Sequence, residues 1–244
     1  MKTRRIFGFG KSEGYERGFH DATVAIIRFM DDTDLNAVNI RGFVIAGGFL
    51  RRHFDGLSSP DVDIFCRDRK TMNDLVDHLT RTYVDPDSYI EIKSPNCSEV
   101  RSQGYRIQVV HKDGLFDTPE DLINAIDFDA CRIAWDKGSD YLVFDDLFEE
   151  HARGRILNYV GSGKPKGSFK RAIRFIERGY KMTEEGIDRL LKDLQEPTTA
   201  AFAGYDEEDP EDSVAACGSK LIVAAPSEYI YDPFAFDDEI EGVA

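Results

Sequence analysis

The sequence predicts an α+β protein in which a mixed β-sheet flanked by helices is followed by a short helical neck and an acidic tail. Three observations support this fold class. Strand-like and helix-like segments alternate through residues 1–150. Helical periodicity dominates residues 168–194, and residues 197–244 are strongly acidic. We therefore expect a head over 1–150, a basic helical neck over 151–196 and a mostly irregular tail over 197–244.

The first part of the head alternates between helix and strand. Apolar residues recur at helical spacing through residues 14–31. GFVIAGG (residues 42–48) is typical of a buried strand that ends in a tight turn, and a helix is expected over 49–54. DVDIF (residues 61–65) alternates as a strand, and residues 71–83 return to helical spacing. These segments form one compact block.

The second part of the head continues the same pattern. YRIQVVH (residues 105–111) alternates cleanly, and DFDACRIAW (residues 127–135) also indicates a strand. The helix PEDLINAI (residues 119–126) separates them. Residues 141–156 are expected to form a strand followed by a helix.

The formal net charge of −15 is unevenly distributed. Residues 197–244 hold twelve acidic residues and one lysine, whereas residues 151–195 hold eleven Lys or Arg against five Asp or Glu. The neck is therefore the surface on which we expect an anionic ligand. Its helical pattern breaks near Gly179 and resumes after a predicted N-cap at Thr183. For the acidic tail we expect a protein partner, or a role as an autoinhibitor that competes with the anionic ligand for the neck.

The composition excludes several classes of protein. No apolar run approaches the ~20 residues that a membrane span requires, and the N-terminus lacks a secretory signal. We therefore expect a cytoplasmic protein with no membrane partner. The cysteines are widely spaced with no CxxC pair, which indicates reduced thiols, and the histidines are equally dispersed, which argues against a zinc site. The cysteines are Cys66, Cys97, Cys131 and Cys217.

Two aspartates carry the strongest chemical signal. Asp61 and Asp63 are separated by one residue on a predicted strand, so their side chains project from the same face about 6.6 Å apart along it. Two carboxylates on one face repel unless a cation compensates, and Mg²⁺ prefers oxygen ligands. Taken alone, such a pair is more often an exposed edge pair or two aspartates next to a turn.

The glycine turn upstream strengthens this interpretation. Gly47 and Gly48 end a buried strand and open a helix, where glycine lets backbone N–H groups approach a triphosphate. Arg51 falls in the first helical turn and is a candidate phosphate ligand. Together with Asp61 and Asp63, these residues predict a nucleotide and Mg²⁺ site.

The segment GGFLRRHFDGLSSPDVDIF (residues 47–65) resembles the signature of the DNA polymerase β-like nucleotidyltransferase superfamily. It is most similar to the head domain of bacterial-type tRNA CCA-adding enzymes and poly(A) polymerases, whose pattern is roughly GGxVRDxLLG, a short loop and DhDh. Arg52 departs from this pattern, because the family usually has aspartate there. The matching positions are Gly47, Gly48, Leu50, Arg51, Gly56, Asp61, Asp63 and Ile64.

Two later stretches resemble the same family. DFDAC (residues 127–131) is similar to its DFTIN strand, which places Asp127 on the family's aspartate, although the paired arginines that usually precede it are absent. Asp129, expected on the same strand face, is the alternative third acidic residue. KRAIRFIERGYKMTEE (residues 170–185) is similar to RAxRFxxxLGFxIxxxT. A helix would place Arg171 and Arg174 on one face, where they would meet phosphate or the edge of the active site; the alternative is a solvated basic face.

The resemblance implies Mg²⁺-dependent transfer of a nucleoside monophosphate from an NTP, such as ATP or CTP, to a hydroxyl acceptor. It implies Asp61, Asp63 and Asp127 as catalytic residues, with two metal ions about 3.5–4 Å apart. The first candidate acceptor is an RNA 3′ end, in particular that of a tRNA. The base-selecting segment of the CCA-adding family is not recognisable, and the compact head also resembles small nucleotidyltransferase-like proteins of bacteriophages. Two alternatives are nucleotidylation of a protein or small-molecule hydroxyl, and a non-catalytic binding module that retains the fold.

Overall fold

The computed structural model describes residues 2–5, 17–82, 89–162 and 164–195. Its main sheet has eight strands. They are β1 (Lys2–Arg5), β2 (Phe43–Ala46), β3 (Asp61–Cys66), β4 (Tyr89–Ser94), β5 (Cys97–Ser102), β6 (Tyr105–Val110), β7 (Ile133–Asp136) and β8 (Tyr141–Phe144). Two short strands, β9 (Ile156–Leu157) and β10 (Lys181–Met182), form a separate parallel pair.

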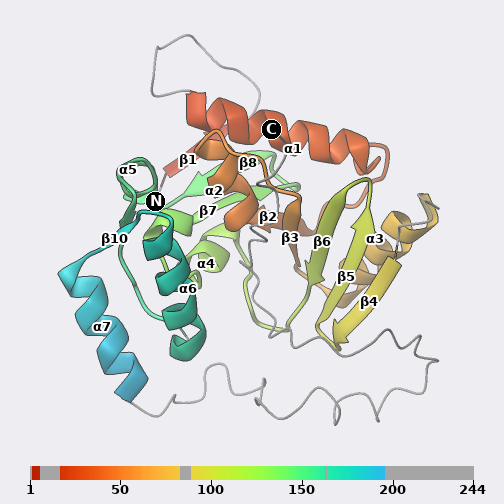
Figure 1. The fold of residues 1–244 in the computed structure, drawn as a ribbon. Coiled ribbons are helices and arrows are strands. Elements are labelled where there is room, and N and C mark those ends of the chain that lie inside the picture. The colour runs from red at the N-terminus through yellow and green to blue at the C-terminus, as the bar shows by residue number, and fades with distance from the viewer. Residues whose placement is uncertain (1, 6–16, 83–88, 163, 196–244) are drawn as a thin grey trace, which may run out of the picture.

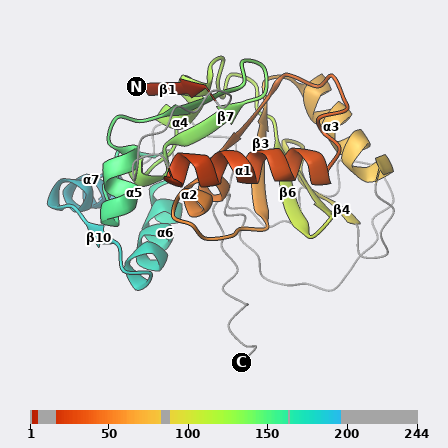
Figure 2. The same ribbon diagram turned by 90° about the horizontal axis from the view of Figure 1, so that it is seen from above.

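Seven α-helices and one 3-10 helix, η1, complete the described part of the chain. The α-helices are α1 (Arg17–Asp32), α2 (Gly48–Phe54), α3 (Arg69–Thr82), α4 (Pro119–Asn124), α5 (Phe148–Gly154), α6 (Pro165–Glu177) and α7 (Glu184–Gln195). The 3-10 helix spans Asp129–Cys131. Figures 1 and 2 place α3 and α7 at opposite ends of the molecule, with α1 crossing the sheet between them.

The sheet is mixed, and this confirms the predicted α+β class. Its strand order is β1-β8-β7-β2-β3-β6-β5-β4. β3 and β6 pair in parallel, whereas the other neighbours pair antiparallel. The parallel pair needs a crossover connection, which α3 and the β4–β5 hairpin provide. β3 consequently lies in the interior of the sheet, with β2 on one side and β6 on the other.

Two apolar clusters hold the elements together. The first lies between the sheet and the helices α1, α2 and α3, and it includes Phe19, Phe29 and Ile64. The second joins the sheet to the neck, because it contains Phe128 of the head together with Phe175 and Leu190 of α6 and α7. The neck is therefore packed directly on the head through buried aromatic and aliphatic side chains.

Most expected elements lie where the apolar spacing predicts them. Helix 14–31 corresponds to α1, strand 61–65 to β3, and the helical neck to α6 and α7. The predicted N-cap at Thr183 is confirmed, because its Oγ1 accepts a hydrogen bond of 3.0 Å from the Gly186 N–H. The described helices include none with the length and hydropathy of a membrane span.

The structure corrects the strand expected over residues 127–135. Phe128 makes an isolated bridge to Tyr159, residues 129–131 turn into η1, and only Ile133–Asp136 is a strand. The expected boundary at residue 150 falls inside α5. The hairpin of β4 and β5 was not predicted. The tail at 197–244 lies outside the described residues.

Candidate functional site

The Gly47–Gly48 turn leads directly from β2 into α2. Gly47 has φ 75° and ψ −127°, and this positive φ is costly for any residue with a side chain. Its N–H donates to the Ile133 carbonyl at 3.0 Å, and its carbonyl accepts from the Arg51 N–H at 3.0 Å. The turn is therefore fixed both to β7 and to the first turn of α2.

The sheet brings this turn to the same end as Asp61 and Asp63. β2 and β3 are antiparallel with Ile45 opposite Ile64, so the end of β2 lies beside the start of β3. Asp63 is 6% exposed, and the Asp61 side chain is 18% exposed. The residues predicted to form a nucleotide and metal site are thus assembled from two adjacent strands.

Arg106 is a member of this site that the sequence did not identify. It lies beside Asp61 in the parallel register of β3 and β6, and its Nε donates to Asp61 Oδ1 at 2.6 Å. The alternation of YRIQVVH does place Arg106 on the face opposite Ile107. It does not tell which strand β6 pairs with, or in which register.

Asp61 and Asp63 are the two carboxylates that would hold Mg²⁺ at this end of the sheet. The described residues contain no group of three or more His, Cys, Asp or Glu side chains that could hold a metal. Mg²⁺ is commonly held by one or two carboxylates together with substrate phosphates, rather than by a complete protein cage. Asp61 and Asp63 meet that requirement if a triphosphate supplies the remaining oxygens.

Arg51 is directed toward the neck. It is 3% exposed, and its Nη1 donates to Tyr180 Oη at 2.6 Å and to Asp55 Oδ2 at 3.0 Å. Its guanidinium also lies 5.2 Å from the centre of the Phe175 ring. Arg51 thus ties the helix that follows the glycine turn to the neck, and its contact with phosphate stays a prediction.

Burial shifts the pKa values of the two residues that accept hydrogen bonds from the Arg51 guanidinium. It raises the pKa of the Tyr180 hydroxyl to about 12, despite the opposing effect of Arg51. Burial likewise raises the pKa of Asp55, and Arg51 offsets only part of the shift.

Asp127 is an ion-pair partner of the neck. It is 3% exposed, and its Oδ2 accepts from Arg171 Nε at 3.0 Å and also from Arg171 Nη2. Its Oδ1 is buried without a hydrogen-bond partner among the described atoms. Arg171, predicted to face phosphate, points toward this carboxylate. Arg174, the other predicted nucleotide ligand on α6, is partly buried.

Asp129 has different partners. It is 1% exposed, accepts from Asn158 Nδ2 at 3.0 Å, and lies 2.9 Å from His151 Nδ1. The expectation that Asp127 and Asp129 share one strand face is wrong, because the backbone turns into η1 at Asp129. Within the described chain, neither aspartate forms a metal-ligand group with Asp61 and Asp63.

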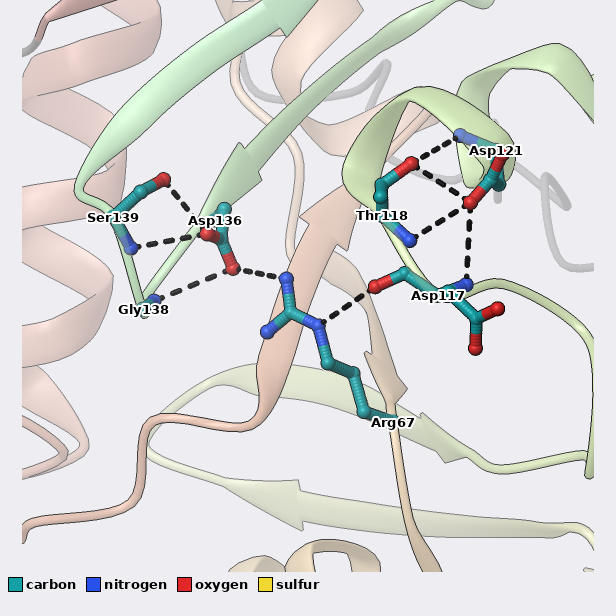
Figure 3. Close-up of polar contacts among 7 residues, drawn as sticks. All are labelled: Arg67, Asp117, Thr118, Asp121, Asp136, Gly138 and Ser139. Carbon is teal, nitrogen blue, oxygen red and sulfur yellow. Dashed lines mark hydrogen bonds and ion pairs between the residues drawn. The ribbon is translucent and has the colours of Figure 1, made fainter.

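A separate polar cluster lies at the other end of β3 (Figure 3). Arg67, which follows the strand, donates to Asp136 Oδ1 at 2.8 Å and to the Asp117 carbonyl at 3.4 Å. Asp136 also accepts from the Gly138 and Ser139 backbones and from Ser139 Oγ. Burial opposes ionisation of Asp136, but Ser139 and Arg67 outweigh it and lower its pKa. These partners give the cluster a structural role between β3 and β7.

Comparison with solved structures shows a nucleotidyltransferase-like fold. The chain is similar to an apo CCA-adding enzyme, with a TM-score of 0.58, 14% identity, and coverage of 79% of this chain and 46% of that chain. For a CCA-adding enzyme with CTP, the TM-score is 0.58 and the identity 15%, with 80% of this chain and 47% of that chain covered. For the Thermotoga maritima CCA-adding enzyme complexed with tRNA, the TM-score is 0.54 and the identity 16%, with 79% of this chain and 46% of that chain covered. The chain spans about half the length of these structures.

Sequence comparison gives a narrower assignment. No curated protein matches the chain. Residues 19–155, which are more than half of it, match the family described as "Gabija anti-defense 2 family protein". The matched range begins in α1 and ends just after α5, so it contains both the glycine turn and the Asp61–Asp63 pair. The chain therefore belongs to the Gabija anti-defense 2 family.

Proposed function

We propose that this protein transfers a nucleoside monophosphate from an NTP to a hydroxyl acceptor in a Mg²⁺-dependent reaction. One observation carries the proposal: the Gly47–Gly48 turn lies at the same end of the sheet as Asp61 and Asp63, in a nucleotidyltransferase-like fold. Glycines that approach a triphosphate and carboxylates that hold its cation are the two components that such a reaction requires.

The residues of the chain position the substrate. The glycine turn, which carries no side chains, permits close approach of a phosphate group to the backbone. Asp61 and Asp63 would hold Mg²⁺ together with the phosphates. When bound, Mg²⁺ would supply charge neutralisation for the reacting phosphoryl group. The burial of Asp63 strengthens its electrostatic interactions, because the protein screens charge less than water does.

For the acceptor, we propose an RNA 3′ end, with tRNA as the first candidate. The neck presents exposed cations, including Lys170 and Lys181, on the part of the chain that follows the head. Basic side chains of this kind bind the phosphate backbone without reading its sequence. One of the similar solved structures is described as a complex with tRNA. In this proposal the head, residues 1–150, carries the chemistry and the neck, residues 151–196, holds the acceptor.

The family description favours a second candidate acceptor. The family description names action against a defence system, and covalent modification of a component of that system is one way to act against it. Nucleotidylation of a serine, threonine or tyrosine hydroxyl on such a component uses the same donor site and the same leaving group. The acidic tail, for which we propose a protein partner, accords with this candidate.

A labelled-nucleotide assay tests the proposal. The purified full chain is incubated with Mg²⁺ and each of the four NTPs labelled at the α-phosphate, in the presence of total RNA and lysate protein. We expect label in the RNA fraction. Asp61→Ala/Asp63→Ala should abolish it. A matched control is Asp74→Ala/Asp77→Ala, which makes the same change of net charge on exposed positions of α3.

The distribution of label separates the candidates. Label in protein and not in RNA would replace the RNA acceptor with the second candidate. Full transfer by Asp61→Ala/Asp63→Ala would show that the site is elsewhere. No transfer to either fraction, together with no Mg²⁺-dependent NTP binding by calorimetry, would leave a non-catalytic module that retains the fold.

A further inference from the structure

We propose that Arg106 supplies the second positive charge of the nucleotide site, so that the site takes one divalent cation with its NTP instead of two. This inference rests on the proposed function and deepens it. It concerns the number of metal ions and the residue that takes the place of one of them.

The position of Arg106 carries the inference. Its Nε lies 2.6 Å from Asp61 Oδ1, and the two residues are register partners on neighbouring strands. The side chains are 15% and 18% exposed, so the pair is partly shielded from water and yet open to a ligand. A guanidinium stays charged throughout the physiological pH range. A fixed cation therefore lies against one of the two carboxylates predicted to bind metal.

The residues that face Asp61 and Asp63 from β6 determine whether this strand provides a further metal ligand. They are Arg106 and Gln108, one cationic and one neutral. Gln108 is 9% exposed, and its Oε1 has no hydrogen-bond partner among the described atoms. The parallel neighbour of the Asp61–Asp63 strand thus contributes no carboxylate, and the described residues contain no group of three anionic or imidazole ligands.

Two divalent ions in one phosphoryl-transfer site lie about 3.5–4 Å apart and need ligands for both. Asp61 and Asp63 provide two carboxylates, and one oxygen of Asp61 already accepts from Arg106. A carboxylate accepts through both oxygens, so this contact is compatible with one bound ion. A second ion would bring two positive charges next to the guanidinium, and the facing positions of β6 provide no carboxylate to offset the repulsion.

Arg106 is also chemically suited to take over part of the role of a second ion. The guanidinium donates through a planar fork that matches two phosphate oxygens. A triphosphate bound through a cation at Asp61 and Asp63 would lie within reach of this fork. The resulting site would combine one Mg²⁺ and one arginine as its positive charges, with Arg106 a positioning residue for the phosphates.

Counting bound Mn²⁺ tests the inference. Electron paramagnetic resonance of the full chain with a non-hydrolysable NTP reports both the number of bound Mn²⁺ ions and spin coupling between close pairs. We expect one uncoupled Mn²⁺ for each NTP-bound chain. Arg106→Glu, which adds a third carboxylate, should bind two coupled ions. Arg106→Gln should keep one ion and bind the NTP about tenfold more weakly, because a charged hydrogen-bond donor is lost.

Arg101→Glu is the matched control. Arg101 is the register partner of Arg106 on β5, and it forms an ion pair with Glu99 at 3.6 Å. This variant should keep one Mn²⁺. Two coupled ions in the unaltered protein would overturn the inference and leave the proposed function standing. Absence of any Mn²⁺-dependent NTP binding in the unaltered protein would overturn both. The unaltered protein decides these outcomes even if Arg106→Glu fails to fold.

Discussion

Two of the chain's Asp-x-Asp sequences, Asp61–Asp63 and Asp127–Asp129, have the same spacing and very different surroundings. Asp61 and Asp63 lie on an extended strand beside a glycine turn, and Asp61 faces a cation from the neighbouring strand. Asp127 and Asp129 flank a bend into a 3-10 helix, and each is held by a different element. Extended backbone directs the first pair to one site, whereas the bend separates the second pair into two structural anchors.

The largest expected effect tests the first pair. Asp61→Asn/Asp63→Asn should reduce transfer by roughly 10⁴-fold, equal to about 5.4 kcal/mol, because both charged metal ligands are lost. The free energy of unfolding should change by about 1 kcal/mol or less, because an Asn oxygen can still accept from Arg106 and the repulsion between two carboxylates on one face is removed. Steady-state rates and urea denaturation measure the two quantities. If this variant failed to fold, Asp61 and Asp63 would be structural residues like Asp127 and Asp129, and the two pairs would not differ in role.

The second expected effect concerns Asp127. Asp127→Ala should lower the free energy of unfolding by about 3–5 kcal/mol, because it removes the ion-pair partner of the largely buried Arg171. Urea denaturation measures this change. Asp127→Leu/Arg171→Met should recover most of the loss, since it removes both charges together. Equal destabilisation in the single and double variants would argue against an anchoring role.

A smaller effect is expected at the partner of Asp129. Asn158→Ala removes the 3.0 Å hydrogen bond to the Asp129 carboxylate and the 2.7 Å hydrogen bond that Asn158 accepts from Thr183, and it should lower the free energy of unfolding by about 1.5–3 kcal/mol. Thermal denaturation followed by circular dichroism is suitable. Asn36→Ala is the control, because the Asn36 hydrogen bond to Asp31 is exposed, and it should change stability by about 0.5 kcal/mol or less. Equal losses of stability in Asn158→Ala and Asn36→Ala would contradict a structural role for the contact between Asn158 and Asp129.

The smallest effect extends the comparison to Asp136, whose pKa is lowered. Its ionised form stabilises the fold above the ordinary carboxyl pKa, and this contribution is lost as the pH falls through the folded-state pKa. The stability difference between the unaltered protein and Asp136→Asn should therefore shrink on acidification. Asp55→Asn should show the opposite trend, because the pKa of Asp55 is raised. Urea denaturation at a series of acidic pH values measures the free energy of unfolding of each protein. If these pKa shifts were absent, the plots of this free energy against pH would be parallel for the variants and the unaltered protein.

Local sequence patterns were enough to predict much of the fold and the two parts of the site, which are the Gly47–Gly48 turn and the Asp61–Asp63 pair. The apolar spacing of α1 and the alternation of β3 follow from burial of one face, which a sequence records directly. The hairpin of β4 and β5 was missed, because CSEVRS (residues 97–102) lacks an apolar alternation. The bend at Asp129 was missed because a carboxylate bound by Asn158 replaces strand pairing there.

The partners of the site residues were beyond the reach of local patterns. Arg106 and Asp61 are 45 residues apart, and their contact depends on which strand lies beside β3. Arg51 and Tyr180 are separated by 129 residues, and their hydrogen bond depends on how the neck packs. In each case the sequence supplies a charged side chain with suitable spacing. The three-dimensional neighbours decide whether that side chain binds a ligand or another residue.

The hydrogen bond between Arg51 and Tyr180 also limits how this head can be recombined with other proteins. Arg51 follows the glycine turn by one helical turn, and its guanidinium is enclosed by neck side chains. A chimera that joined the head to an unrelated neck would leave this buried cation with Asp55 of the head, but without the Tyr180 hydroxyl and the two aromatic rings of the neck. During evolution, the phosphate-approaching turn and the neck are therefore expected to be inherited as one unit.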